Sequence, residues 1–226
     1  MSLRVAMRAV PLLCLCLAGC SGLFQSKAKP EQIYYLRAPA ASTGPAAPAA
    51  AMPASLRVVR PVADPGLDSP HIMLVQADHR MNFYNGSRWP APSPELIEAL
   101  AVQTLRASGE WASVEDSGSP FPSDYLLQVH VRRFEADYTG AGAAPVVRVV
   151  LDCILGRRQG RDVLATFTAS GESAAPANHL SQVVVAFEQA TGTALEALAQ
   201  QAAQVARGDV RRAANNEEKA PPSSDR

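Results

Sequence analysis

The fold is decided by residues 147–155, which read VRVVLDCIL. Apolar side chains occupy every second position of this stretch, while Arg148 and Asp152 occupy positions between them. Successive side chains of a β-strand point to opposite faces of a sheet, so this period of two predicts a strand with one covered face. The apolar set is Val147, Val149, Leu151, Cys153 and Leu155.

Residues 125–132 and 163–170, on either side of this stretch, alternate in the same way. The short segments 139–142 and 158–160 contain glycine and join the three strands as hairpin loops, which predicts antiparallel pairing. The side chains expected on one shared face are Tyr125, Leu127, Val129 and Val131, with Val163, Ala165, Phe167 and Ala169 opposite Leu164, Thr166, Thr168 and Ser170.

Shorter strands are expected before these three. Residues 56–62, 71–75 and 111–114 are rich in β-branched, aromatic and other apolar residues. Asn85-Gly86 is the pair that favours a two-residue type I′ turn, so residues 80–84 and 87–89 are predicted to form a hairpin around it.

Two amphipathic helices complete the pattern. Ser93 is the expected N-cap of the first, with Pro94 and Glu95 in its first turn and Gly109 after its end. Asn178 is the expected N-cap of the second, which is predicted to stop at Gly208. The sequence therefore predicts an α+β fold, a two-layer sandwich of a mostly antiparallel sheet with two amphipathic helices on one face.

The N-terminus has the layout of a secretion signal. Basic residues precede a short apolar run, and Leu17, Ala18 and Gly19 then lead to Cys20. These residues resemble the lipobox of bacterial lipoproteins, in which the cysteine is acylated and the chain is cut before it. Residues 1–19 are therefore predicted to be a lipoprotein signal peptide, with an ordinary signal peptide or a buried helix as the alternatives.

The remaining chain divides by composition. Residues 20–54 are predicted to form a linker rich in Ala and Pro, with a short β-segment near 33–36. Residues 55–207 form the folded domain, and 208–226 are expected to be a disordered tail. Cys153 would be the one cysteine left unmodified, and its place in an alternating strand predicts a core residue.

Charge and motifs argue against several functions. Basic and acidic side chains balance at 21 each, which gives no electrostatic footprint for nucleic acid. The four histidines and the cysteines show no metal-ligand spacing, and neither a Gly-x-Ser-x-Gly elbow nor a phosphate-binding loop is present. We therefore expect no enzyme activity, no metal and no cofactor.

Aromatic residues near the predicted turn are the candidates for binding a partner. Phe83 and Tyr84 could anchor an interface, as aromatic side chains often do. Trp89 is a further partner-facing candidate, although packing under the first helix is the favoured interpretation for it.

The order of these features resembles a known family. The lipobox is followed by Tyr34-Tyr35-Leu36, by a strand ending in Arg60-Pro61, and by aromatic residues leading to Trp89-x-Pro-x-Pro; Gly109-x-Trp111-x-x-Val114, long strands and a long helix follow. Over roughly residues 31–205 this is similar to the ABC-type transport auxiliary lipoprotein family, of the paraquat-inducible protein C type.

The resemblance implies a role and partners. Such a protein would be held by its lipid in the outer membrane and would face the periplasm. It would dock on a mammalian-cell-entry-type substrate-binding protein that works with an ABC permease and ATPase in lipid transport between membranes, and it could form homo-oligomeric rings. Two alternatives remain at this point: an assembly factor for an outer-membrane β-barrel, and a secreted hydrolase whose site the sequence does not reveal.

Overall fold

The structure is a computed structural model that describes residues 30–39 and 51–219. The chain divides into two units, Met1–Glu31 and Gln32–Arg226, and the fold lies in the second. The predicted signal peptide and Cys20 lie outside the described residues.

The elements follow in the order of strands, helix, strands, helix. The first group is β1 (Gln32–Ile33), β2 (Met52–Val58), β3 (Val62–Ala63), β4 (His71–Val75), β5 (Met81–Arg88) and α2 (Ser93–Ala107); the second is β6 (Trp111–Glu115), β7 (Tyr125–Asp137), β8 (Val146–Arg157), β9 (Val163–Ala174) and α3 (Leu180–Lys219).

The three long strands pair as predicted. β7 with β8 and β8 with β9 are antiparallel, and all five apolar positions of 147–155 are fully buried. Two bulges then change the alternation. One near Arg132 puts Phe134 and Ala136 on the covered face, and one at Leu164 brings Val163 level with Gly156, so Val163 is 66% exposed and does not share the face of Ala165.

The sheet as a whole is mixed, so the expected antiparallel pairing holds for only part of it. β7 receives β2, β3 and β4 in succession along its second edge, all in parallel. β6 adds to β2 and β1 to β5, also in parallel, while β4 and β5 are antiparallel. One path across the sheet runs β1-β5-β4-β7-β8-β9, so β1 and β9 lie at opposite edges.

The hairpin predicted at Asn85-Gly86 is wrong. β5 runs through both residues, and the chain turns earlier, where His79 N–H donates to the Gln76 carbonyl at 2.8 Å and His79 has φ 64°. Gly86, with φ 67°, instead lies in an irregular section of β5 between the pairs Met73–Phe83 and His71–Arg88. A glycine with a positive φ angle therefore fits a β-bulge as well as a turn.

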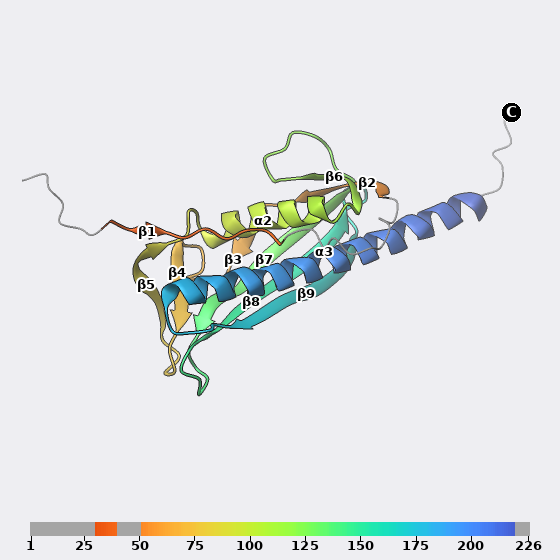
Figure 1. The fold of residues 1–226 in the computed structure, drawn as a ribbon. Coiled ribbons are helices and arrows are strands. Elements are labelled where there is room, and N and C mark those ends of the chain that lie inside the picture. The colour runs from red at the N-terminus through yellow and green to blue at the C-terminus, as the bar shows by residue number, and fades with distance from the viewer. Residues whose placement is uncertain (1–29, 40–50, 220–226) are drawn as a thin grey trace, which may run out of the picture. The chain divides into compact units, whose positions relative to one another are not determined.

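Both helices lie on the same face of the sheet (Figure 1). Ser93 is the first residue of α2 and does not cap it; its hydroxyl donates to the Leu67 carbonyl at 2.8 Å. Asn178 accepts a hydrogen bond from the Tyr138 hydroxyl at 2.7 Å, two residues before α3 begins. At the centre of the packing, Phe187 of α3 contacts Trp89 and Phe134 with ring centroids 5.2 and 5.1 Å away.

α3 approaches the sheet closely at Gly171 of β9. A Cβ atom at this position would lie 2.0 Å from the carbonyl oxygen of Ala190, so only glycine allows the contact. With 40 residues the helix is about 60 Å long, and Figure 1 shows it extending past the sheet. Within the described residues, no helix has the length and apolar character needed to cross a membrane.

The predicted helix end at Gly208 is wrong, and residues 208–219 are helical rather than disordered. Side chains on both sides of Gly208 bind the rest of the domain. Arg207 Nε donates to Glu110 at 2.8 Å, and the buried Asp209 accepts from Arg157 of β8. These contacts offset the roughly 1 kcal/mol that a glycine costs inside a helix.

Two parts of the predicted linker 20–54 are structured. Residues 32–39 lie on the domain, and Leu36 is fully buried in its core. At the other end β2 begins at Met52, whose N–H donates to the Glu110 carbonyl at 2.9 Å. The rest of the predicted linker, residues 20–29 and 40–50, lies outside the described residues.

Candidate docking surface

The face of the sheet that turns away from the helices carries the outward side chains of β7, β8 and β9. Its middle is polar and internally paired. His130 Nε2 lies 2.8 Å from Asp64, and Arg132 lies 3.4 Å from Asp152, which also accepts from the Thr168 hydroxyl at 2.7 Å. These charges are satisfied within the chain.

One end of this face holds a buried charge cluster. Glu135 is 3% exposed and accepts from Arg133 Nε at 2.5 Å and from the Phe134 N–H at 2.7 Å. Asp137 lies 3.1 Å from Arg133 Nη2 and also pairs with Arg148. Burial raises the pKa of Glu135 despite Arg133. Burial also opposes the charge of Asp137, but hydrogen bonds from Thr139 and Arg133 outweigh it and lower the pKa of that carboxyl.

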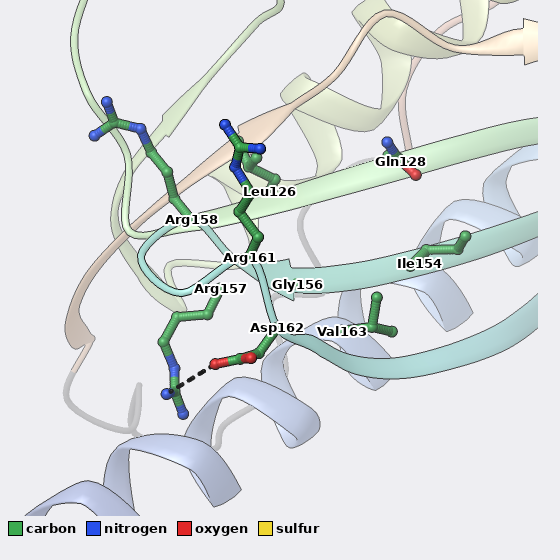
Figure 2. Close-up of a pocket in the computed structure, with 9 residues that line it drawn as sticks. All are labelled: Leu126, Gln128, Ile154, Gly156, Arg157, Arg158, Arg161, Asp162 and Val163. Carbon is green, nitrogen blue, oxygen red and sulfur yellow. Dashed lines mark ion pairs between the residues drawn. The ribbon is translucent and has the colours of Figure 1, made fainter.

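The other end of the face holds a shallow depression of about 280 Å³, next to the loop between β8 and β9. Leu126, Ile154 and Val163 form an apolar floor across three strands, and Figure 2 shows Gln128, Ile154 and Val163 on adjacent strands. The other lining residues are Gly156, Arg157, Arg158, Arg161 and Asp162.

The three arginines at this depression differ in what holds them. Arg157 is committed to the domain: its Nη2 and Nε lie 2.5 and 3.2 Å from the two carboxylate oxygens of Asp209, and its Nη1 lies 3.8 Å from Asp162. The guanidinium groups of Arg158 and Arg161 are exposed and have no ion pair or hydrogen bond to any residue in the described ranges. They are the two free cations of the depression.

The hairpin loop presents Arg161 in an unusual backbone conformation. Arg161 has φ 57° and follows Gly160 at φ 77°, so two consecutive residues are left-handed. This conformation costs a residue with a Cβ atom about 1–2 kcal/mol. Figure 2 shows the Arg161 and Arg158 side chains on the Leu126 side of the loop, away from Arg157.

Asp209 fixes the base of this loop to α3. Burial would raise its pKa, but hydrogen bonds from Arg157 and Tyr125 together with the charges of Arg157 and Arg212 lower it below its ordinary value. The Tyr125 hydroxyl donates to Asp209 at 3.0 Å, and burial with that carboxylate raises the pKa of Tyr125 to about 12. The base of the loop is therefore held by the neutral Tyr125 hydroxyl and by the ion pair of Arg157 with Asp209.

The depression has the chemistry of a binding surface. An apolar floor beside two unpaired guanidinium groups fits an apolar side chain flanked by carboxylates. Cys153 is buried on the opposite face, and burial next to Asp152 raises the pKa of its thiol to about 12, so it is not a nucleophile at neutral pH. Over the described residues, no group of three or more His, Cys, Asp or Glu side chains could hold a metal ion.

The predicted partner-facing aromatics are not brought together as one surface. Phe83 is 40% exposed and stacks on His71 at 4.3 Å. Tyr84 is half-buried, and its hydroxyl shares a hydrogen bond of 2.7 Å with Tyr138. Trp89 is fully buried and cannot face a partner, because the chain passes into the core between β5 and α2.

Sequence reasoning treated residues 158–160 only as a loop and did not single out Arg158 or Arg161. One signal was available: three arginines within 157–161 are an unusual density for a hairpin tip. The Glu135–Asp137 cluster was also missed, because the bulge at Arg132 reverses which residues of β7 face the helices.

Three solved structures give the range of similarity. Protein XCC0632 from Xanthomonas campestris is 26% identical, with a TM-score of 0.70 over 81% of this chain and 99% of that one. An uncharacterized protein is 17% identical with a TM-score of 0.54, over 80% and 99%. The PelC dodecamer from Paraburkholderia phytofirmans, at 19% identity over 66% and 89%, has a TM-score of 0.38, which carries no argument about this chain.

No curated protein matches the sequence significantly. The pattern of one family, described as ABC-type transport auxiliary lipoprotein component, matches residues 34–206. That range begins at Tyr34, two residues before the buried Leu36, and ends at Ala206 within α3. The chain belongs to the family of ABC-type transport auxiliary lipoprotein components.

Proposed function

We propose that this protein is a non-enzymatic docking subunit of an envelope lipid-transport system. Acyl chains on Cys20 would hold it in the outer membrane, facing the periplasm. The domain would bind a mammalian-cell-entry-type substrate-binding protein that works with an ABC permease and ATPase. Family membership supports the link to ABC-type transport.

The observation that carries the docking role is the depression beside the β8–β9 loop. Isolated exposed charges are common, but here two guanidinium groups without a partner among the described residues lie beside an apolar floor, on the face opposite to α2 and α3. Arginine is among the residues that most often dominate the binding energy of protein interfaces. The middle of the same face, in contrast, has its charges paired within the chain.

The mechanism is tethering and binding, with no chemical step. Several acyl chains hold a protein stably at a membrane, since each buried methylene contributes about 0.8 kcal/mol. The domain would then keep the partner close to the same membrane, which raises the effective concentration of the partner there.

Purification of the full-length, lipidated protein from detergent-solubilised membranes tests the partner. We expect a mammalian-cell-entry-type protein to co-purify with the wild type and to be depleted with Arg158→Glu/Arg161→Glu. The double variant Arg80→Glu/Arg211→Glu, which reverses two other exposed arginines, is the matched control and should retain the partner. Recovery of an outer-membrane β-barrel instead would support an assembly factor and contradict this proposal.

The anchor is tested separately. Metabolic labelling with a fatty-acid analogue should label the wild type and not Cys20→Ser, and density fractionation should place the labelled protein with outer-membrane markers. Co-fractionation with inner-membrane markers would contradict the proposed location without affecting the partner experiment.

A further inference from the structure

We infer that residues 32–39 are a strap that fixes one edge of the domain to the bilayer, with the Ile33 and Tyr35 side chains resting on the lipid surface. This inference rests on the proposed lipid anchor at Cys20. It names a second interaction surface, distinct from the depression at the β8–β9 loop.

The first half of the strap is bound to the sheet edge. Gln32 and Ile33 pair in parallel with Ser87 and Arg88 of β5, and the Tyr34 N–H donates to the Arg88 carbonyl at 2.9 Å. Backbone pairing of this kind fixes which side chains point inward and which point outward.

The second half of the strap is bound to α3. Leu36 is fully buried, and the Arg37 N–H donates to Glu188 at 3.4 Å. Pro39 lies 3.7 Å from the position that a Cβ atom on Gly192 would occupy. In Figure 1 the strap, in red-orange, runs from β1 toward α3, so it is held at both ends.

Alternation along the strap leaves two large side chains outside. Tyr34 is half-buried and Leu36 fully buried, while Ile33 and Tyr35 are 58% and 64% exposed. Both belong to a segment that the domain already holds in place, so contact with another surface would cost little further ordering of the backbone.

The length of chain between Cys20 and the strap points to the bilayer as that surface. Ile33 follows Cys20 by 13 positions, and a chain of this length spans at most about 45 Å. A random coil of the same length averages about 20 Å end to end. Tyrosine is among the residues that prefer the headgroup region of a bilayer, where its ring and hydroxyl are both accommodated. The bilayer that would hold Cys20 is therefore within reach of the strap.

The position of the strap in the sheet also agrees with the docking proposal. β1 and β9 are opposite edges of the path β1-β5-β4-β7-β8-β9, about 24 Å apart at five strand spacings. A domain held at β1 therefore leaves the depression at the β8–β9 loop free to meet a partner.

Fluorescence quenching by lipid tests the strap directly. The full-length, lipidated variant Tyr35→Trp is reconstituted in vesicles of phosphatidylethanolamine and phosphatidylglycerol that carry brominated acyl chains. We expect its emission to shift to shorter wavelength and to be quenched. The matched control is Phe121→Trp, whose parent side chain is 67% exposed on a different loop, and it should be neither shifted nor quenched. The native Trp89 and Trp111, both buried, supply a constant background that the wild type measures.

Ile33→Trp is a second reporter, so the test does not depend on one variant folding. If vesicle flotation shows the protein to be anchored, and neither strap position is quenched more than position 121, the inference is wrong while the anchor stands. If the wild type does not float and Cys20 carries no lipid, the anchor is refuted and the inference falls with it.

Discussion

The two faces of the sheet are built from the same three strands, but one face is buried and the other is exposed. On the covered face, β8 buries Leu151 and Cys153 completely beneath α3, and Phe187 joins Trp89 and Phe134 in one aromatic cluster. On the other face, Ile154 is 37% exposed, and the nearest residues of β8 on that face are Asp152 and Gly156. A single strand thus contributes to the core on one side and to the proposed docking surface on the other.

The uncovered face is itself divided by how its charges are satisfied. Asp64, Asp137 and Asp152 have partners within the chain, whereas Arg158 and Arg161 have none among the described residues. Paired charges need nothing from outside, but unpaired guanidinium groups beside an apolar floor gain from binding an acidic partner. This difference is the reason for proposing the docking surface at one end of the face.

Truncation of one side chain on each face should show most clearly how differently the two faces contribute to the free energy of unfolding. Leu151→Ala removes a fully buried side chain and should lower the free energy of unfolding by about 2–5 kcal/mol. Ile154→Ala, three residues further along the same strand, should lower it by less than about 1 kcal/mol. Urea denaturation followed by circular dichroism measures both, and equal losses would contradict the assignment of faces.

Asp209 should contribute stability in a pH-dependent way. Asp209→Asn removes the charge that Arg157 and Tyr125 bind and should lower the free energy of unfolding at pH 7 by about 1–3 kcal/mol. The pKa of Asp209 is lower in the folded chain than in the unfolded one, so its stabilisation is present above about pH 4 and is lost as the pH falls through the folded value.

The measurement is the difference in unfolding free energy between wild type and Asp209→Asn, taken from neutral pH downward. The two proteins should converge in acid. A difference that stayed constant below about pH 3 would show that the ion pair is not its source.

The alternation in residues 147–155 was sufficient to predict which side chains of β8 are buried, because burial on one face selects apolar residues at every second position. The same logic failed at Val163 and beyond Val131, because a bulge adds a residue without leaving a mark in the hydrophobic pattern. Parallel pairing of β2, β3 and β4 with β7 was also missed, since alternation carries no information on strand direction.

Glycine was the other source of error. Gly86 and Gly208 both look like chain breaks in sequence, but one sits in a strand and one in a helix. Local preferences of about 1 kcal/mol were outweighed by tertiary contacts, such as those of Asp209. The docking depression could not be predicted for a related reason: its floor joins residues from three strands, and only the register brings them together.

Cys153 provides a finer probe of the covered face. Because its thiol is fully buried and its pKa is raised to about 12, iodoacetamide should leave it unmodified in the native protein at neutral pH and should modify it in denaturant. Peptide mapping by mass spectrometry measures the modified fraction. Rapid modification of native Cys153 would mean that α3 opens from β8 far more readily than its packing indicates.

Binding at the β8–β9 loop tests the central claim most directly. The affinity of a purified mammalian-cell-entry-type partner is measured for wild type, Arg158→Glu/Arg161→Glu and the control Arg80→Glu/Arg211→Glu. All three should have unfolding free energies within about 1 kcal/mol of one another, since the substituted side chains are exposed and a surface ion pair such as that of Arg80 with Asp78 contributes no more than this. The loop variant alone should bind at least about tenfold more weakly, a loss of about 1.4 kcal/mol. Equal binding by the loop variant and the wild type would contradict the assignment of this depression as the docking surface.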